Sequence, residues 1–423
     1  MLTPLSITAA VDSGISDGEL RNALTKALGA RSGKLKRVLL IVPDFTRFHS
    51  NAGFIANFLF HKLTPETEVD LLEALGTHFP MTREQCAKMY GDIPFDSFIP
   101  HNWRTDTVKL GVVPEDFIRE VSEGVMDVPF DVELNAKIFD GYDLILSIGQ
   151  VVPHEIVGMA NHSKNVLIGC GGASMINLSH MLGAFYGMER IMGRDKTPVR
   201  KVLDYAAEKY LANLPLAYIL TVTTAPENRI TTHGLYIGQD RSCFEDAIAT
   251  SLTKNLTLLD TPIKKALVFL DEDEFHSTWL GNKAIYRTRM AMADDGELIV
   301  LAPGVRRFGE DDAVDALIRK YGYCGRETVI RLFRENADLR ANQSAAAHLI
   351  HGSSDGRFSV TYCTKHLRED EVRGVGFGYL PYDEAVAKYN LRELKDNPCN
   401  PEADVFYIPN PALGLWADKS RFL

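Results

Sequence analysis

Side chains suited to chemistry are concentrated in one stretch of the sequence, "PHEIVGMANHSKNVLIGCGGASMINLSH", which runs from Pro153 to His180. It holds three histidines, one lysine and a GCGG turn. Imidazole suits metal binding and proton transfer, a buried lysine amine can become a nucleophile, and glycine amides can approach an anion. The stretch therefore predicts a metal, acid–base or anion site, and its residue types alone leave these three chemistries open.

Two shorter clusters could serve the same chemistry. "PDFTR" contains Asp44, Thr46 and Arg47, where a carboxylate can accept from ribose hydroxyls and Thr and Arg can hold a phosphate or carboxylate. "GTHFPMT" contains His78, and an imidazole suits a general acid or base. Each cluster also has a structural interpretation: a helix N-cap with a surface ion pair for the first, and a solvated cap residue for the second.

Each cluster follows an apolar run with the character of a buried strand. "RVLLIVPDFTR" (37–47) is followed by helical spacing over 51–63, "EVDLLEALGTHFPMT" (68–82) by a helix from "TREQCAKMYG", and "YDLILSIGQVVPHE" (142–155) repeats the pattern. Strands that alternate with helices predict an α/β domain with a largely parallel sheet. Ligands bind at the carboxyl ends of such strands, so we expect all three clusters to lie at one edge.

The alternation restarts after "LTLLDTPIKK" (257–265). We therefore expect two α/β domains, with a cofactor and the active site in the cleft between them. The predicted domains are a cofactor-binding domain over 1–260 and a domain covering the substrate site over 261–402, and the tail 403–423 could rejoin the first. The predicted elements of the second domain are a strand at 266–271, a helix at 282–295, a strand at 296–304 and helices from 311 and 327.

Composition narrows the function classes. The chain has 423 residues, 45% of them hydrophobic, and a net charge of -10, which argues against a nucleic-acid-binding protein. Its six cysteines are scattered without a CxxC pair, so neither a common zinc motif nor a disulfide framework is indicated. No basic, apolar leader and no run of 18 apolar residues occurs, so we expect a cytoplasmic protein that does not bind membranes.

Within the opening stretch, His154 ends a predicted strand and Lys164 and His180 follow it. His180 falls on a predicted helix, where a core histidine satisfied by one hydrogen bond is the structural alternative. Gly171 and Gly172 in the GCGG turn could present backbone amides to an anion. His162 and the cysteines are taken as structural. "GVGFG" (374–378) lacks the GxGxxG spacing of a dinucleotide site and is expected to form a late, isolated strand.

Together, "DFTR", "GTHFPMT" and "PHEIVGMANHSK…NLSH" resemble three ordered signatures of the lactate racemase family, the nickel-pincer nucleotide enzymes. The resemblance covers about the first 190 residues. It implies Ni²⁺ and a nicotinate-derived cofactor, the nickel complex of pyridinium-3-thioamide-5-thiocarboxylic acid mononucleotide. The enzymes that make this cofactor would then be partners of the chain.

The resemblance also implies roles for individual residues. Asp44 would bind the cofactor ribose, Thr46 its phosphate, and Arg47 would lie by the cofactor and the substrate carboxylate. Lys164 would hold the cofactor through a thioamide. His180 would be the protein ligand of nickel, which accepts imidazole in a tetragonal geometry.

In family terms the reaction is racemisation or epimerisation at C2 of a 2-hydroxy acid. The substrate would give its C2 hydride to the cofactor while a base takes the hydroxyl proton, and the planar 2-keto acid can be reduced again from either face. Inversion needs one acid–base group on each face, and His78 and His154 fit that requirement.

The second domain departs from the lactate-type pattern. Where such members have a "YQAQK"-like run, this chain has "YRTRM" (286–290), which includes Tyr286 and Arg287. With Trp279 nearby, these residues are expected to bind a substrate larger than lactate. We expect a polyhydroxylated sugar acid, such as D-gluconate epimerised at C2, with another short or bulky 2-hydroxy acid as the alternative.

Three other classes remain to be weighed. An NAD-dependent dehydrogenase is opposed by the absence of GxGxxG after the first strand, and a zinc hydrolase by the absence of HxxxH or HExxH spacing. A non-enzymatic carrier or sensor of the cofactor is opposed by the filled catalytic positions. The sequence is compatible with a homo-oligomer and does not specify one.

Overall fold

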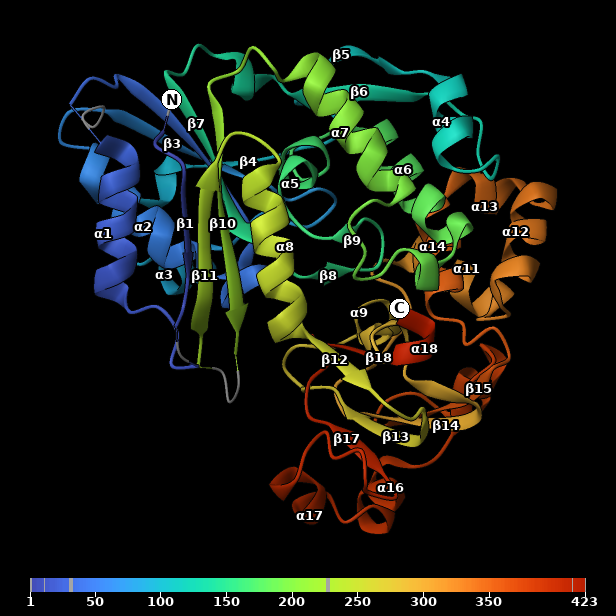
Figure 1. The fold of residues 1–423 in the computed structure, drawn as a ribbon. Helices are drawn as coiled ribbons and strands as arrows, with labels where there is room; N and C mark the ends of the chain where they lie inside the picture. The colour runs from blue at the N-terminus through green and yellow to red at the C-terminus, as the bar shows by residue number, and fades with distance from the viewer. Residues whose placement is uncertain (1, 11, 30–32, 226–228, 413, 423) are drawn as a thin grey trace. The chain divides into compact units, whose positions relative to one another are not determined.

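The computed structural model describes residues 2–10, 12–29, 33–225, 229–412 and 414–422. The chain forms two compact units, one of Met1–Ser179 and Gly193–Asn255, the other of His180–Met192 and Leu256–Leu423 (Figure 1). The boundary between the two units follows Asn255, five residues before the boundary expected at residue 260. The tail, expected to return to the first domain, pairs instead with strands of the second unit.

A seven-stranded sheet organises the first unit, in the order β1-β11-β10-β7-β2-β3-β4. The five strands from β10 to β4 are parallel, and β11 and β1 add an antiparallel edge. The three strands expected from the sequence are its centre. The bounds are β1 Leu5–Thr8, β2 Arg37–Val42, β3 Glu68–Glu73, β4 Phe98–Pro100, β7 Leu144–Gln150, β10 Leu216–Thr224 and β11 Thr231–Gly238.

Strand composition explains this arrangement. Every residue of β7 is buried, and so is every residue of β2 after Arg37, as expected where helices cover both faces of a parallel sheet. One face packs on α1, α2 and α3 in a single apolar core. Figure 1 shows α8 on the other side, where it contacts β10 and β11. The helices are α1 Asp17–Leu28, α2 Ala52–Leu63, α3 Arg83–Tyr90, α4 Glu115–Val121, α5 Ser163–Leu167, α7 Pro198–Tyr210 and α8 Ser242–Asn255.

Smaller elements complete the first unit. Two antiparallel ribbons lie outside the main sheet, and 3-10 turns connect strands to helices. The helix α6 (Ala173–Tyr186) begins in this unit and ends in the second. The ribbons and turns are β5 Thr107–Val113 with β6 Phe130–Asn135, β8 Pro153–His154 with β9 Gly158–Met159, η2 Phe45–Ser50, η3 Phe95–Ser97 and η4 Ala136–Phe139.

The second unit is built on a five-stranded parallel sheet in the order β16-β15-β14-β13-β17, and a separate parallel pair joins β12 to β18. Its strands are β12 Leu256–Leu259, β13 Ile263–Phe269, β14 Met292–Ala302, β15 Phe358–Thr364, β16 Gly378–Tyr379, β17 Phe406–Ile408 and β18 Leu415–Asp418. Its helices are η5 Met188–Arg190, α9 Thr278–Gly281, α10 Lys283–Tyr286, α11 Asp312–Tyr321, α12 Arg326–Glu335, α13 Ala337–Ala341, α14 Gln343–His351, α15 Glu369–Gly374, α16 Tyr382–Lys388, α17 Leu391–Asp396 and α18 Lys419–Phe422.

Two local predictions for this unit were wrong. Within the helix expected at 282–295 only the four-residue α10 is helical, and strand β14 already begins at Met292. Residues 284–292 are all buried, so no amphipathic face distinguishes helix from turn. The strand expected at 374–378 is reduced to β16, which is paired with β15 rather than isolated.

No helix in the described part of the chain is long and apolar enough to cross a membrane.

Candidate functional site

The sheet brings the three clusters to one edge. Strands β7, β2 and β3 are parallel neighbours, so the loops that follow them leave the sheet at the same end. Asp44 follows β2, His78 follows β3, and His154 lies four residues beyond β7. The common edge expected from the sequence is therefore present.

Asp44 begins the 3-10 turn η2. Its Oδ1 accepts from the backbone N–H of Thr46 at 2.7 Å, the hydrogen bond of an N-cap. Arg47 lies in the same turn, and its guanidinium donates to Oγ1 of Thr46 at 3.3 Å. The structural interpretation of "PDFTR" as a cap is thus correct, and it does not exclude a ligand because Thr46 is exposed.

The second carboxylate oxygen of Asp44 binds His78. Nδ1 of the imidazole lies 2.8 Å from Oδ2 of Asp44. The aspartate side chain is only 8% exposed, whereas that of the histidine is 44% exposed. Burial would raise the pKa of the Asp44 carboxyl, but the neighbouring His78 and Arg47 and the hydrogen bond from Thr46 outweigh burial and hold that pKa well below its usual range. The carboxylate is therefore ionised.

This contact defines the proton positions on His78. An ionised carboxylate can only accept, so Nδ1 carries a proton, and in the neutral imidazole Nε2 carries the lone pair. A lone pair on a partly exposed nitrogen is what a general base requires. The sequence indicated ribose binding or an N-cap for Asp44 and gave no sign of its contact with His78, because nothing in the sequence pairs residues 34 positions apart.

Backbone N–H groups on both sides of the loop that carries His78 donate hydrogen bonds that fix its conformation. The backbone N–H of His78 donates to Leu75, and the N–H of Met81 donates to Oε2 of the buried Glu73 at 3.1 Å. Burial, together with the charge of Asp44, raises the pKa of the Glu73 carboxyl against the hydrogen bond from Met81. Sequence analysis missed Glu73 because it is the last residue of a strand and forms no motif. At the loop tip, Phe79 is 80% exposed.

His154 lies in the short ribbon formed by β8 and β9 and is 8% exposed. Its Nδ1 accepts from the backbone N–H of Ile156 at 3.1 Å and lies 3.7 Å from a carboxylate oxygen of Glu155. In this arrangement the neutral ring carries its proton on Nε2. The two histidines expected to play symmetric roles thus have different partners on Nδ1.

Lys164 is on α5, the short helix that follows the ribbon. Burial lowers the pKa of its ammonium to about 8, and the positive charge of Arg47 acts in the same direction. The carboxylates of Glu155 and Asp44 also act on it, in the opposite direction. Lys164 is therefore electrostatically coupled to Arg47 and Asp44 of the "PDFTR" cluster and to Glu155, and its amine is partly neutral near pH 8, as a nucleophile needs.

The amides of the GCGG turn have partners within the protein. The N–H of Gly171 donates to Ile168 and that of Gly172 to the backbone carbonyl of Glu133. The Glu133 carboxylate also accepts from the N–H of Ser174 at 3.4 Å, at the start of α6. In this structure protein carbonyls accept from both glycine amides, and the role of Gly171 and Gly172 in holding the cofactor stays a prediction.

His180 lies on α6, where the chain passes from the first unit to the second. Across the described residues, no three His, Cys, Asp or Glu side chains are grouped so that they could hold a metal ion.

In the second unit, two of the three expected substrate residues are buried. Arg287 is 4% exposed, and its guanidinium donates to the carbonyl of Gly414 at 3.4 Å; Tyr286 is 6% exposed. Trp279 is half-buried and stacks on the ring of His348 at 4.4 Å between centroids. In this structure the guanidinium of Arg287 is buried and has a backbone partner, and its contact with a substrate stays a prediction.

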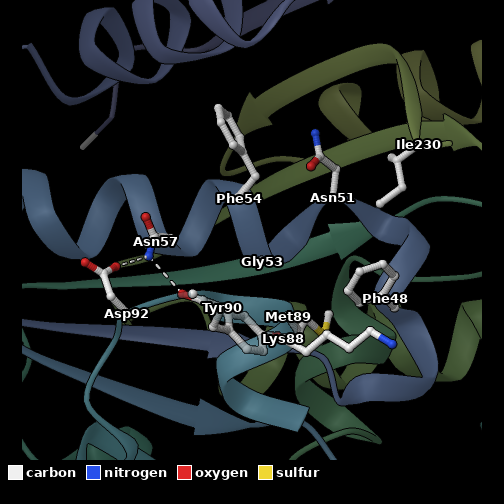
Figure 2. Close-up of a pocket in the computed structure, with 11 residues that line it drawn as sticks. Phe48, Asn51, Gly53, Phe54, Asn57, Lys88, Met89, Tyr90, Asp92 and Ile230 are labelled. Carbon is white, nitrogen blue, oxygen red and sulfur yellow. Dashed lines mark hydrogen bonds between the residues drawn. The ribbon is translucent and has the colours of Figure 1, made fainter. Parts of the chain in front are cut away.

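Figure 2 shows a shallow cavity of about 400 Å³ in the first unit, between α2, α3 and η2. Asn57 crosses one end, donating to the carbonyl of Tyr90 and to Asp92 at 2.8 Å each. Phe48 and Lys88 line the other end. The cavity shares η2 with the site, but Asp44, Thr46 and Arg47 do not line it.

Comparison with known proteins identifies the class. The family model described as the lactate racemase N-terminal domain matches residues 6–191. This range contains Asp44, His78, His154, Lys164 and His180. Residues 6–191 are therefore similar to the N-terminal domain of the lactate racemase family, and the resemblance over about the first 190 residues is confirmed. No curated protein sequence matches the chain.

Two solved structures share the fold over nearly the whole chain. A protein from Thermotoga maritima is similar with a TM-score of 0.83 and 23% identity, over 98% of this chain and 100% of that one. The lactate racemase apoprotein from Thermoanaerobacterium thermosaccharolyticum is similar with a TM-score of 0.72 and 16% identity, over 96% of this chain and 93% of that one. At these identities the comparisons establish the α/β fold.

Proposed function

We propose that this protein is a racemase or epimerase that inverts C2 of a 2-hydroxy acid. The observation that carries the proposal is the hydrogen-bonded Asp44–His78 dyad at the carboxyl edge of the sheet, with Lys164 electrostatically coupled to Asp44. These groups lie within the residues that are similar to the lactate racemase N-terminal domain. The family supports 2-hydroxy acid racemase or epimerase activity in general, while the residue roles are our proposal.

The residues fit a nickel-pincer nucleotide. Lys164 offers an amine whose ammonium has a lowered pKa, which suits formation of a thioamide link, and Thr46 and Arg47 offer donors for a phosphate or carboxylate. His180 offers one imidazole, which suits a nickel ion whose other ligands come from the nucleotide. When bound, the group supplies a site that takes a hydride from C2 and returns it.

Proton transfer falls to the two histidines. Nε2 of His78 accepts the proton of the substrate hydroxyl, and Asp44 stabilises the imidazolium that results. Protonated His154, with Glu155 3.7 Å from its Nδ1, returns a proton when the opposite enantiomer forms. In the reverse direction the two histidines exchange roles, which requires neutral His154 to carry its proton on Nδ1, toward Glu155, in place of the hydrogen bond from Ile156. Arg47 is the proposed partner of the substrate carboxylate.

For the substrate we propose a polyhydroxylated sugar acid, with D-gluconate as the representative aldonate. The support is the departure of "YRTRM" from the lactate-type run and the partial exposure of Trp279. Another short or bulky 2-hydroxy acid is the alternative.

The test combines metal content with intact mass, on protein produced together with the pincer biosynthesis enzymes. We expect about one nickel per chain, an added mass equal to the nucleotide, and C2 inversion of at least one member of a panel of aldonates and short 2-hydroxy acids. His78→Gln should abolish inversion and keep the nickel. His61→Gln is the matched control, because His61 also pairs with an aspartate, Asp92, at 2.8 Å but at an exposed position of α2.

Loaded protein that inverts no 2-hydroxy acid would refute the proposed activity. Protein that takes up neither nickel nor added mass under these conditions would refute the cofactor assignment. Inversion of short acids but not of aldonates would refute only the substrate class.

A further inference from the structure

The backbone immediately before Lys164 is strained. Asn161 has φ 70° and His162 has φ 57° with ψ −133°, two consecutive non-glycine residues with positive φ. The conformation of His162 is one that glycine adopts readily and that costs other residues about 1–3 kcal/mol. Such strain persists only where the surrounding structure holds it.

Part of that restraint is the ring of His162. It is 6% exposed and lies between Tyr218 on β10 and Phe244 on α8, with centroid distances of 3.9 Å and 5.0 Å. Burial is the main reason that the pKa of this imidazole is well below its usual value, with the charges of Arg200 and Arg241 acting in the same direction. His162 is therefore a neutral, packed ring, consistent with its structural assignment from the sequence.

The second restraint is Arg200 on α7, which is 1% exposed. Its guanidinium donates to the carbonyls of Met159 at 2.7 Å and Asn161 at 3.2 Å, and to Oγ of Ser163 at 2.9 Å. One side chain thus donates hydrogen bonds to the turn on both sides of His162. The planar fork of arginine suits this, since an ammonium cannot reach three separated acceptors in one plane.

An ionic network fixes Arg200 in turn. Ser163 Oγ donates to Asp204, one turn further along α7, and Arg241 pairs with both Asp204 and Asp195. Burial lowers the pKa of Arg200 to about 10 despite these carboxylates, which shows how far it is removed from water. A buried charge is costly and adds little net stability, so the network calls for another explanation.

We propose that Arg200 and His162 are positioning residues, which hold residues 159–163 in a strained turn and thereby fix the half-buried Lys164 directly after it in the first turn of α5. The functional value of that placement rests on the proposed role of Lys164 as cofactor anchor. The geometry itself does not, and it can be tested on apoprotein.

The first test compares His162→Ala with His162→Gly. Both remove the stacked ring, but only alanine keeps the strain of a Cβ at this φ and ψ. The readout is the pH profile of Lys164 modification by an amine-specific acylating reagent, followed by peptide mass spectrometry, with the exposed Lys62 of α2 as internal standard. The midpoint of such a profile reports the amine environment rather than its accessibility.

We expect wild type and His162→Gly to share a midpoint near pH 8, the value to which burial lowers the pKa of Lys164. In His162→Ala the turn relaxes and Lys164 enters water, so its midpoint moves toward the usual value of about 10.4. Each unit of that shift lowers the relative modification rate at pH 7 about tenfold. If the His162 ring acted only through packing, His162→Gly would shift the midpoint more than His162→Ala, because glycine normally destabilises a folded segment more than alanine does.

The second test uses Arg200→Lys and Arg200→Met. The charge of Arg200 itself lowers the pKa of Lys164, so loss of charge alone would shift the midpoint in the methionine variant. The lysine variant keeps the charge and loses the fork, and we expect its midpoint to rise as well. Melting temperature and far-UV circular dichroism on each variant identify any that fail to fold, and the His162 pair then decides alone.

Unshifted midpoints in both His162→Ala and Arg200→Lys would overturn the proposal. An equal shift in His162→Ala and His162→Gly would overturn it too, since ring packing rather than backbone strain would then place the amine. Failure of the racemase proposal appears separately, as lack of nickel or of inversion in otherwise normal wild-type protein.

Discussion

Asp44→Asn tests most directly whether the aspartate prepares His78 as a base. In the wild type, Oδ1 accepts from the N–H of Thr46 and Oδ2 accepts from Nδ1–H of His78. The N–H of Thr46 is a backbone donor and cannot change. The asparagine must therefore keep its oxygen toward Thr46 and turn its NH₂ group toward the histidine.

That orientation reverses the proton positions on the ring. An amide NH₂ donates, so Nδ1 of His78 must become an acceptor and the proton moves to Nε2. The nitrogen that should take the substrate proton then already carries one. An aspartate-to-asparagine change of this kind costs about 10⁴ in kcat in a serine protease triad, so we expect a loss of about 10³–10⁴, or roughly 4–5 kcal/mol.

The effect on stability should be smaller. Loss of one charge-assisted hydrogen bond costs about 1.5–3 kcal/mol, and water can replace part of it because the His78 side chain is 44% exposed. A cost on the order of 2 kcal/mol leaves a typical domain folded. The variant should therefore be a folded protein with a specific loss of rate.

The assay has two parts. Selective ¹⁵N-histidine labelling of the apoprotein reports which ring nitrogen of His78 carries the proton, and inversion per nickel-loaded chain reports kcat. Asp92→Asn is the control, because it alters the exposed His61–Asp92 pair without touching the site. Unchanged ring ¹⁵N shifts of His78 in Asp44→Asn, or a kcat within about tenfold of wild type, would refute the reasoning.

Three further predictions concern pH and ion pairs. Folding lowers the pKa of Asp44, so its ionised carboxylate stabilises the protein at neutral pH, and this stabilisation is lost as the pH falls below about 4. In urea denaturation the unfolding free energies of wild type and Asp44→Asn should therefore converge in acid. A difference that stays constant with pH would contradict this. Burial raises the pKa of Glu73, so ionisation of its carboxyl destabilises the folded wild type. The unfolding free energy of Glu73→Gln relative to wild type should therefore rise between about pH 4 and 7. A difference that does not change with pH would show that the carboxyl ionises without cost. Arg289 is 5% exposed and pairs with Glu189 at 3.1 Å and with Asp355 at 2.6 Å. Arg289→Met should therefore lower the unfolding free energy by about 3–5 kcal/mol. The control is the exposed pair of Arg368 with Asp370, whose loss should lower the unfolding free energy by less than about 1 kcal/mol.

The architecture of the first unit followed from sequence because its signals are local. The apolar runs beginning at residues 37, 68 and 142 become the neighbouring strands β2, β3 and β7, and Thr82 with Gln85 forms the capping box that starts α3. In the second unit the same reasoning failed at 282–295. A segment buried on all sides has no polar face, so the spacing of its apolar residues cannot distinguish a long helix from a short helical turn.

The candidate site divides in the same way. The sequence by itself determined which chemical groups are present and, through the strand order it predicts, that Asp44, His78 and His154 leave one edge of a sheet. Only the tertiary structure decided their partners: Asp44 on His78, Ile156 on His154, Ile168 and Glu133 on the glycine amides, and Arg200 beneath the turn before Lys164. Hydrogen bonds between residues tens of positions apart depend on packing of the whole core, and packing leaves no local trace in the order of amino acids.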